Sequence, residues 1–428
     1  MKKYAKLFAL ILAVLTVGGC GAPETPDFGL VTDAITTDPD ATRITAPMTP
    51  ETTDVNVRTE DGIAYEYPET TVPVDDGSTR ITFLAAGDNI IHENVFLDAK
   101  ARAKAGQDYN FKDMYAGIAE FVKSADLAFI NQETPICGDD EFAAYGYPNF
   151  NSPEAVGDTL VDIGFDVVNI ANNHMLDMKE KGYVGTLDYW DEWADEVTLL
   201  GGYRNRADYE NIRVVTEQGI SIAFLSYTYG TNGMTLNAGS EMFIPLIDEA
   251  EIVSKIKEAR KLADLVFVVM HWGQENWFQL SKEQVTLANA ITEAGADVII
   301  GMHPHVVQPV EWKTASDGSK TLVIYSLGNL ISTQYDNYNM IGGMMTFDIV
   351  KDAFGNVYIE NPIFNPTVTH YNKERLGLGV YLAENYTAEL CALHGTPDYG
   401  KDKTWTLPYI RSIIQKNVDA QFLTKFFQ

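Results

Sequence analysis

Basic residues are scarce in this chain of 428 residues, which contains 31 lysines and arginines against 60 aspartates and glutamates. The formal net charge is therefore −29 at pH 7. Nucleic acids and anionic lipid surfaces are bound mainly through an excess of lysine and arginine. Nucleic-acid binding is thus excluded as the main function.

Cysteines are also few, with three in the whole chain. Two of them, Cys137 and Cys391, lie far apart in the sequence. Such residues can pair in an oxidising compartment, but their spacing alone does not predict a bond. We assign no disulfide.

Several sequence signatures of catalysis are missing. The chain has no Gly-x-Ser-x-Gly elbow, and Cys137 lacks the local signature of a nucleophile. No Walker-type phosphate loop or Gly-x-Gly-x-x-Gly turn follows the first predicted strand. Serine-hydrolase and nucleotide-driven chemistry therefore have little support.

The N-terminus reads as an export signal. Lys2 and Lys3 precede an apolar run from Leu7 to Val17, which is shorter than the roughly 18–20 residues of a membrane-spanning helix. The run ends at Val17-Gly18-Gly19-Cys20, which resembles the lipobox of bacterial lipoproteins. This resemblance implies a signal peptide over residues 1–20, a lipid on Cys20 and a location at the extracytoplasmic face of the bacterial cell membrane. The alternative is an ordinary signal peptide in which Cys20 is incidental.

Residues 21–79 are rich in Thr, Pro, Asp and Glu, with 13 acidic and 2 basic residues and no sustained apolar periodicity. A segment of this composition cannot bury enough apolar surface to offset the entropy of ordering. We therefore expect a disordered tether between the membrane anchor and a folded domain.

From Arg80 onward, short apolar runs end in polar residues or glycine. Five of these runs are expected as buried strands: Ile81–Ala86, Leu127–Ile130, Val167–Ala171, Leu265–Met270 and Val298–Ile300. Apolar spacing near 3.6 residues predicts helices over Tyr115–Lys123, Ala250–Leu262 and Lys282–Ala294. This alternation predicts one α/β domain over residues 80–370.

A second set of patterns predicts antiparallel hairpins. The expected strands are Ile212–Val215, Ile220–Tyr227, Thr321–Tyr325 and Met344–Val350, with turns at Ser316-Asp317-Gly318 and Phe354-Gly355-Asn356. Residues 371–428 are expected to form a helical extension, with its helices within Leu376–Leu393 and Leu407–Phe427.

Polar residues gather at the ends of the predicted strands. Five of the seven histidines lie there: His92, His174, His271, His303 and His305. The accompanying acids and amides are Asp88, Asn131, Glu133, Asn172, Asn173, Asp177 and Glu275. In open α/β sheets the ligand site lies outside the carboxyl ends of the strands, so these side chains are expected to converge.

The run Gly301-Met302-His303-Pro304-His305 is the most informative of these segments. Pro304 favours an extended backbone, in which residues two apart project to the same side. We therefore expect His303 and His305 to reach one site.

Taken singly, a strand-end aspartate is usually a cap and a histidine is usually a hydrogen-bonded structural residue. The joint set instead predicts a metal site, because imidazoles beside carboxylates suit Zn, Mn or Fe. A bridging carboxylate would allow two divalent ions, and the sequence supplies enough candidate ligands for both.

Six motifs together resemble the CapA-type capsule-synthesis family, which is associated with poly-γ-glutamate capsules. The resemblance runs over residues 81 to about 333. The motifs are Gly87-Asp88, Asn131-Gln132-Glu133-Thr134-Pro135, Ala171-Asn172-Asn173-His174, His271-Trp272-Gly273-Gln274-Glu275, Gly301-Met302-His303-Pro304-His305 and Tyr325-Ser326-Leu327-Gly328-Asn329. The family is similar to calcineurin-like metallophosphoesterases, which implies a four-layer α/β/β/α sandwich with a metal site at one end of its sheets.

The resemblance also implies a ligand set. Asp88, Glu133 and His305 would surround one ion, while Asn173, His271 and His303 would surround the other, with Glu133 bridging them. His174 would face the substrate as an acid or hydrogen-bond donor.

The roles of several other residues remain open. Glu275 would either act as a general base or orient His271. Ile90 stands where metallophosphoesterases carry a histidine, so His92 either compensates or lies behind the ligands. Asn131, Asn172, Asp177 and Asn329 are candidates for ligands or for residues that support them.

Three functions are compatible with these candidate site residues. The first is a metal-dependent hydrolase or processing factor that acts on poly-γ-glutamate or a related envelope amide polymer, alongside its synthesis machinery. The second is a surface phosphoesterase, and the third is a non-catalytic, membrane-tethered subunit for assembly or export of the polymer. The acidity of the chain counts against binding an anionic polymer unless metals or a local basic group offset it.

Overall fold

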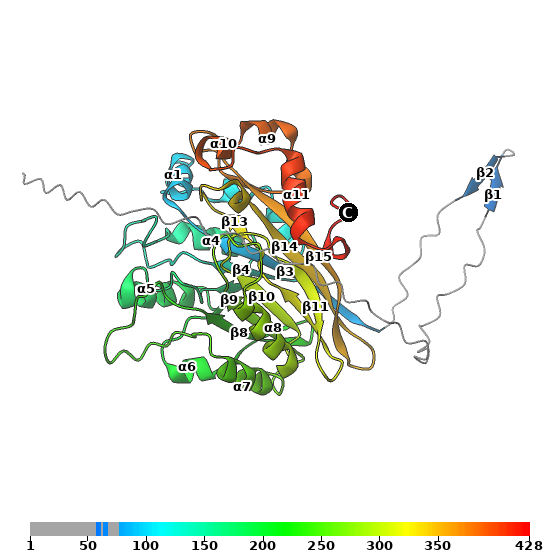
Figure 1. Cartoon of the computed structure of the whole chain (residues 1–428), viewed down its shortest axis with the longest axis horizontal. Coiled ribbons are helices and arrows are strands. Elements are labelled where there is room, and N and C mark those ends of the chain that lie inside the picture. Colours follow the sequence, from blue (N-terminus) through cyan, green and yellow to red (C-terminus); the bar gives the residue numbers. More distant parts are fainter. Residues whose placement is uncertain (1–56, 61–62, 67–76) are drawn as a thin grey trace, which may run out of the picture. The chain divides into compact units, whose positions relative to one another are not determined.

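The computed structural model describes residues 57–60, 63–66 and 77–428 of the chain (Figure 1). The chain divides into two compact units, residues 1–72 and 73–428. In the first unit, β1 (Val57–Glu60) and β2 (Ile63–Glu66) pair antiparallel, so the stretch predicted as a disordered tether contains a short hairpin. The predicted signal peptide, Cys20 and most of the predicted tether lie outside the described residues. Among those that are described, no helix has the length and apolar character to span a bilayer.

The second unit contains an eight-stranded sheet with parallel and antiparallel parts. Its parallel part is β3, β4, β5 and β6, and β13 also pairs parallel with β3. Antiparallel strands β14, β15 and β16 extend the sheet on the other side of β3. The bounds are β3 Thr79–Asn89, β4 Leu127–Gln132, β5 Val167–Asn169, β6 Thr198–Leu200, β13 Asn329–Ile331, β14 Ile341–Lys351, β15 Val357–His370 and β16 Gly379–Leu382.

A six-stranded sheet forms the second half of the core. Its central strands β8, β9, β10 and β12 run parallel, while β7 and β11 pair antiparallel at the two edges. The bounds are β7 Arg213–Glu217, β8 Ile220–Thr228, β9 Leu265–His271, β10 Val298–Met302, β11 Val310–Thr314 and β12 Lys320–Ile324.

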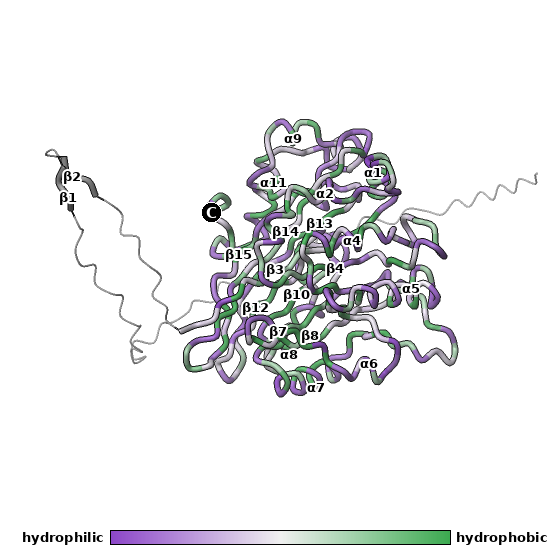
Figure 2. The backbone as a smooth tube through the Cα atoms, turned by 180° about the vertical axis from the view of Figure 1, so that it is seen from behind, coloured by the Kyte–Doolittle hydropathy of each residue, from purple (hydrophilic) through white to green (hydrophobic). Residues whose placement is uncertain are grey.

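Four phenylalanines mark the interface between the sheets. Phe83 of β3 packs edge-on against Phe267 of β9, with ring centroids 5.1 Å apart. Phe224 of β8 and Phe347 of β14 stack on Phe83 at 6.3 and 5.1 Å. The two sheets therefore face each other across an apolar layer, which Figure 2 shows as green tube along the central strands.

Helices cover the outer faces of both sheets. On the six-stranded sheet, α7 (Glu249–Ala259) and α8 (Lys282–Ala294) bury an apolar cluster against β8, β9 and β10. Helix α8 begins at a capping box made by Ser281 and Gln284, and it ends at Gly295 in the left-handed conformation. Buried side chains of α1 to α5 join the core of the eight-stranded sheet. Their bounds are α1 Glu93–Ala101, α2 Lys112–Tyr115, α3 Ala119–Lys123, α4 Glu154–Asp162 and α5 Lys179–Asp191, and α6 spans Arg206–Glu210. This arrangement is the predicted four-layer α/β/β/α sandwich.

The strand predictions hold, and two helix predictions need correction. The helix expected over Tyr115–Lys123 is divided between α2 and α3, because the chain turns at Ala116–Ile118. The stretch Leu376–Leu393 contains strand β16, which pairs with β15, before helix α9 (Ala388–Leu393) begins. Pairing at a sheet edge therefore overrides the helical pattern there.

The C-terminal segment continues with short helices. These are α10 (Thr396–Tyr399) and α11 (Leu407–Asn417), and 3₁₀ turns occur at Asn337–Met340, Ala383–Asn385 and Ala420–Phe422. Helix α11 falls within the predicted Leu407–Phe427 stretch but ends ten residues earlier. Cys137 and Cys391 are both buried and unpaired.

Candidate metal centre

The carboxyl ends of strands from both sheets meet at one place. Asp88 lies near the end of β3, and its Oδ2 accepts a hydrogen bond of 3.2 Å from the backbone N–H of His303, which follows β10. Asn173 follows β5, and its Oδ1 lies 2.9 Å from Nε2 of His271 at the end of β9. The predicted convergence of strand-end side chains is therefore present, and it joins the two sheets.

Gly87 allows the close backbone approach that holds Asp88. A Cβ atom at position 87 would lie 2.1 Å from the carbonyl oxygen of Gly328, so only glycine fits there. That same carbonyl accepts the Asp88 N–H at 2.9 Å. Asn131 donates to Asp88 Oδ1 at 2.8 Å, so the carboxylate is fixed at both oxygens.

Glu133 is the central acid of the site and is 1% exposed. Its Oε1 lies 3.6 Å from His305 Nε2 and 4.0 Å from His271 Nε2, and it has no hydrogen-bond partner among the described residues. Burial, followed by the neighbouring charge of Asp88, raises the pKa of Glu133 well above its usual value. A carboxylate in this setting requires a cation or a proton.

The His303-Pro304-His305 segment is not extended, and the prediction of its backbone was wrong. His303 has φ 96° and His305 has φ 57°, both in the left-handed region that non-glycine residues rarely adopt. The bend is fixed by Asn276, whose N–H donates to the Pro304 carbonyl at 2.8 Å. Both imidazoles nevertheless reach the same site, with ring centroids 5.6 Å apart. Strained backbone of this kind is concentrated at functional sites.

His305 is oriented by its Nδ1. This nitrogen lies 3.1 Å from Asp88 Oδ2 and 3.0 Å from Asn329 Oδ1, so it carries the proton and donates it to these oxygens. Nε2 is then left with a free lone pair toward Glu133. An outer carboxylate or amide that fixes the tautomer in this way is typical of metal-binding histidines.

Two groups of side chains could each hold a cation. One is Glu133, His303 and His305, and the other is Asp88, Glu133 and His271; in each group the ligand atoms lie within 4.8 Å of one another. The two groups share Glu133, as the resemblance implied. The resemblance implied that His303 and His271 hold the same ion. In the structure His303 is instead grouped with His305.

The histidine nitrogens fit a cation. Burial, followed by the charges of neighbouring histidines, lowers the pKa of His271 and of His303 well below the usual value, so both are neutral. His303 Nδ1 and Glu133 Oε1 are buried without a partner. Neutral imidazoles and unpaired carboxylate oxygens are the donors that Zn, Mn and Fe take. The residues present therefore suit a divalent transition metal.

His174 lies beside this set and is positioned by Asp177. Its Nδ1 is 2.7 Å from Asp177 Oδ2, which also accepts the N–H of Phe150 at 2.8 Å. The Phe150 ring packs edge-on against the imidazole at 4.9 Å. Asn172 accepts the His174 N–H at 2.9 Å through its Oδ1 and fixes the loop. The remaining ring nitrogen, Nε2, is the one available to a substrate.

His92 and Glu275 lie outside both ligand groups. His92 belongs to neither group of ligand atoms, and its Nδ1 lies 3.3 Å from the Thr333 N–H, which donates to it. Burial, followed by the charge of His305, lowers its pKa to about 3. Glu275 is exposed and makes no hydrogen bond or ion pair with any residue that the structure describes, although its charge contributes to the raised pKa of Glu133.

Two site residues were missed by the sequence analysis. The ring of Tyr229 packs on His303 with centroids 4.6 Å apart, and Asn232 Oδ1 accepts a 3.1 Å hydrogen bond from Asn173. Both follow β8, which the sequence predicted only as a hairpin strand. Because β8 also pairs parallel with β9, the strand-end rule applied to it would have found them.

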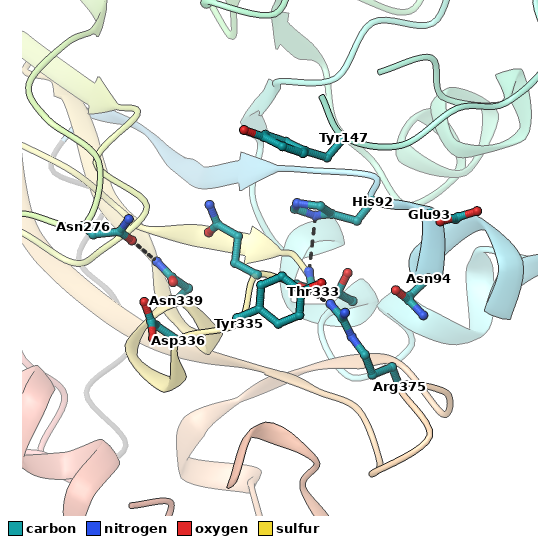
Figure 3. A pocket seen from close by; sticks show the side chains of 11 residues that line it. His92, Glu93, Asn94, Tyr147, Asn276, Thr333, Tyr335, Asp336, Asn339 and Arg375 are labelled. Atoms are coloured by element: carbon teal, nitrogen blue, oxygen red, sulfur yellow. Dashed lines mark hydrogen bonds between the residues drawn. The ribbon is translucent and has the colours of Figure 1, made fainter. Parts of the chain in front are cut away.

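A pocket of about 490 Å³ adjoins the ligand loops (Figure 3). Its wall is joined to the site by Asn339, whose Nδ2 donates to the His305 carbonyl at 3.0 Å and to Asn276 Oδ1 at 2.8 Å. The lining residues are His92, Glu93, Asn94, Tyr147, Asn276, Thr333, Gln334, Tyr335, Asp336, Asn339 and Arg375.

Comparison with known proteins gives a consistent assignment. The family model for "Bacterial capsule synthesis protein PGA_cap" matches residues 82–334. "PGA biosynthesis protein CapA" of Bacillus subtilis (strain 168) is 34% identical over 208 residues, which cover 46% of this chain and 50% of that protein. "Capsule biosynthesis protein CapA" of Bacillus anthracis is 32% identical over 237 residues, which cover 54% and 55%. The chain spans about half the length of these curated relatives.

Among solved structures, the NAD nucleotidase of Haemophilus influenzae aligns over 70% of this chain and 61% of its own, with a TM-score of 0.43 and 13% identity. So low a score supports no conclusion about function. The family match, in contrast, covers more than half of the chain and contains every residue of the two ligand groups. The chain belongs to the bacterial capsule synthesis protein PGA_cap family.

Proposed function

We propose that the protein is a metal-dependent hydrolase or processing factor that cleaves amide bonds in poly-γ-glutamate or a related envelope polymer. The observation that carries the proposal is the buried, unpaired Oε1 of Glu133 between two groups of imidazole and carboxylate ligands. The choice of polymer is supported by the names of the curated relatives, which concern capsule and PGA biosynthesis. A lipid on Cys20 would hold the protein at the extracytoplasmic face of the membrane, near the synthesis machinery.

Amide hydrolysis adds water across the C–N bond, so the carbonyl carbon gains a hydroxyl and the leaving nitrogen gains a proton. A divalent ion, when bound, polarises the carbonyl oxygen and makes water more acidic. Asp88, Glu133, His271, His303 and His305 would hold such ions. Asn131 orients two of these ligands, since it donates to Asp88 at 2.8 Å and to Glu133 at 3.4 Å.

His174 is suited to deliver the proton to the leaving nitrogen. Its Nδ1 lies 2.7 Å from Asp177 Oδ2, which fixes the orientation of the ring. Nε2 is therefore directed away from Asp177, and from this atom a proton can be passed to the leaving nitrogen. A general acid placed in this way contributes about 10²- to 10⁴-fold to a rate.

Metal content and amide hydrolysis, measured on the full-length protein, test the proposal. We expect about two equivalents of a transition metal, because two groups of side chains could each hold a cation, and cleavage of a γ-linked glutamate oligomer. Glu133→Gln should lose metal and activity, whereas the control Glu283→Gln, at an exposed position on α8, should keep both.

Other results would favour the alternatives. Hydrolysis of a generic phosphodiester without hydrolysis of the oligomer would assign the site to phosphoester chemistry. A folded protein that takes up no metal on add-back and cleaves neither substrate would leave the non-catalytic assembly subunit as the better account.

A further inference from the structure

The pocket beside the metal centre contains a cation without an acidic partner. Arg375 follows β15, and its guanidinium donates to the Thr333 carbonyl. The guanidinium also lies over the rings of Tyr335, Tyr399 and Tyr371, at 4.8, 5.3 and 5.8 Å from their centroids. No carboxylate among the described residues pairs with it, and its Nε is buried without a hydrogen-bond partner.

Figure 3 shows the Arg375 side chain directed toward Thr333 and His92 at the pocket wall. An arginine held by aromatic faces and one carbonyl keeps N–H groups free for an anion. A guanidinium binds carboxylates and phosphates through paired N–H donors, so the pocket has the group that an anionic ligand requires.

The rest of the lining favours a polyamide over a phosphate. Four carboxamide side chains face the pocket: Asn94, Asn276, Gln334 and Asn339. Carboxamides both donate and accept hydrogen bonds, as peptide groups do. Glu93 and Asp336 also line the pocket, so a dianionic phosphate would meet two negative charges and one positive one. A single carboxylate on an amide backbone is the better match.

Two tyrosines widen this recognition surface. Tyr147 is 75% exposed and Tyr335 is 62% exposed, and both line the pocket. Large aromatic side chains exposed beside a cation can cover the aliphatic part of a glutamyl residue.

The pocket is also linked to the proposed proton donor. The ring of Phe150 packs edge-on against His92 at 5.3 Å and against His174 at 4.9 Å. Phe150 therefore connects the pocket wall, through His92, to the proposed proton donor.

We propose that this pocket binds a glutamyl residue of the polymer beside the cleavage site, with Arg375 holding its free carboxylate. The inference rests on the proposed function and names the group that the substrate must carry. Arg375, Tyr335, Asp336 and Asn339 lie beyond residues 82–334, so the cationic group of the pocket comes from outside the family match.

Binding of two matched ligands to the full-length protein tests the inference. One is a γ-linked glutamate oligomer, and the other is the same oligomer with its free carboxylates converted to amides. We expect Arg375→Gln to weaken binding of the first by about 10- to 100-fold and of the second by less than about twofold, because only the first offers a charged partner. Arg375→Lys, which keeps the charge but loses the planar fork, should fall between.

Arg411→Gln is the matched control. Arg411 lies in the same C-terminal segment, stacks on Phe426 at 4.8 Å and donates to a backbone carbonyl, but it does not line the pocket. This variant should bind both ligands as the parent does, and thermal melting of each variant reports its folding.

Three results would overturn the inference. The first is unchanged binding of the glutamate oligomer by a folded Arg375→Gln protein. The second is an equal loss of affinity for both ligands in that variant. The third is displacement of the oligomer by inorganic phosphate at a lower concentration than by free glutamate. In each case the parent protein still binds the oligomer, so the proposed function is not overturned by the result. If the parent binds neither oligomer, the proposed function falls together with the inference.

Discussion

The molecule contains two groups of buried histidines that differ in their hydrogen bonds and in the carboxylates near them. In the C-terminal part, His370 Nδ1 lies 2.8 Å from the Tyr386 hydroxyl, and His394 Nε2 lies 2.9 Å from the Thr369 carbonyl. At the strand ends, His271 and His303 each retain a buried nitrogen without a partner. Burial lowers the pKa of His370 to about 4 and of His394 to about 3, and it also lowers the pKa of His271 and of His303.

A lowered histidine pKa therefore does not by itself identify a functional site in this protein. What separates the groups is hydrogen-bond satisfaction and the nearby carboxylates. His394 is bonded at both nitrogens, since its Nδ1 also accepts the Thr396 N–H at 3.0 Å. The strand-end histidines face Glu133, which itself lacks a partner at Oε1. The first group stabilises the fold, whereas the second is prepared for a cation.

The largest expected effect is that of His303→Ala. We expect loss of bound metal and a fall in amide hydrolysis of about 100-fold or more, because even residues that support a ligand cost 10- to 100-fold. Elemental analysis and initial rates measure both. In the chelator-treated protein, His303→Ala should change the free energy of unfolding less than His394→Ala does. A variant that keeps its full metal complement would remove His303 from the ligand set.

His394→Ala should have the opposite result. Removing this ring deletes its hydrogen bonds with the Thr369 carbonyl and the Thr396 N–H and opens a gap beside Trp405, whose ring centroid is 4.3 Å away. We expect a loss of about 2–3 kcal/mol in the free energy of unfolding, measured by urea denaturation, with metal content unchanged. If metal were lost as well, the distinction between the two groups of histidines would fail.

Asp177→Asn tests the residue that positions His174. The amide oxygen can still accept hydrogen bonds from His174 and Phe150, but the carboxylate charge beside the imidazole is lost. We expect a fall in activity of about 10- to 100-fold with full metal content. Asp140→Asn, at an exposed position, serves as the control. Equal activities in the two variants would show that Asp177 does not support catalysis.

Acid should destabilise the fold through His370 and His394. Their folded pKa values, about 4 and about 3, lie below the usual 6.5, so between these limits the unfolded chain binds more protons than the native one. The free energy of unfolding should therefore fall as the pH drops below about 6.5, by up to about 1.4 kcal/mol per pH unit for each histidine. Urea titrations of the chelator-treated protein between pH 7 and pH 4.5 measure the slope. His394→Gln should show a shallower slope, and an unchanged slope would contradict the assignment.

Glu275→Gln should have the smallest effect. The side chain is exposed and forms no hydrogen bond with the described residues, so water screens its charge. We expect less than a threefold change in the rate of amide hydrolysis and unchanged metal content. A loss of 100-fold would instead support the general-base role that the sequence left open.

The sequence predicts the parts of this molecule that depend on local pattern. Helix α8 has the predicted bounds, and β9 differs by one residue. The residues of the two ligand groups were also predicted, because parallel strands bring their carboxyl ends to one edge whatever the details of packing.

Features set by distant contacts were not predictable. The bend at His303 and His305 depends on a hydrogen bond from Asn276 to Pro304, which no local pattern reveals. Strand β16 forms because its residues pair antiparallel with β15 at the edge of the sheet. Arg375 belongs to no motif, and only the fold brings it to the pocket wall.

The position of β14 has a consequence for how the family region is handled in practice. This strand follows residue 334, where the family match ends, and it pairs along β3 from Lys351 and Thr79 to Met344 and Ala86. A protein truncated at the family boundary would leave β3, the strand that carries Asp88, as an open edge able to recruit a strand from another molecule. The unit of homology is thus shorter than the unit of folding, and the isolated homologous segment should aggregate rather than fold into a small active domain.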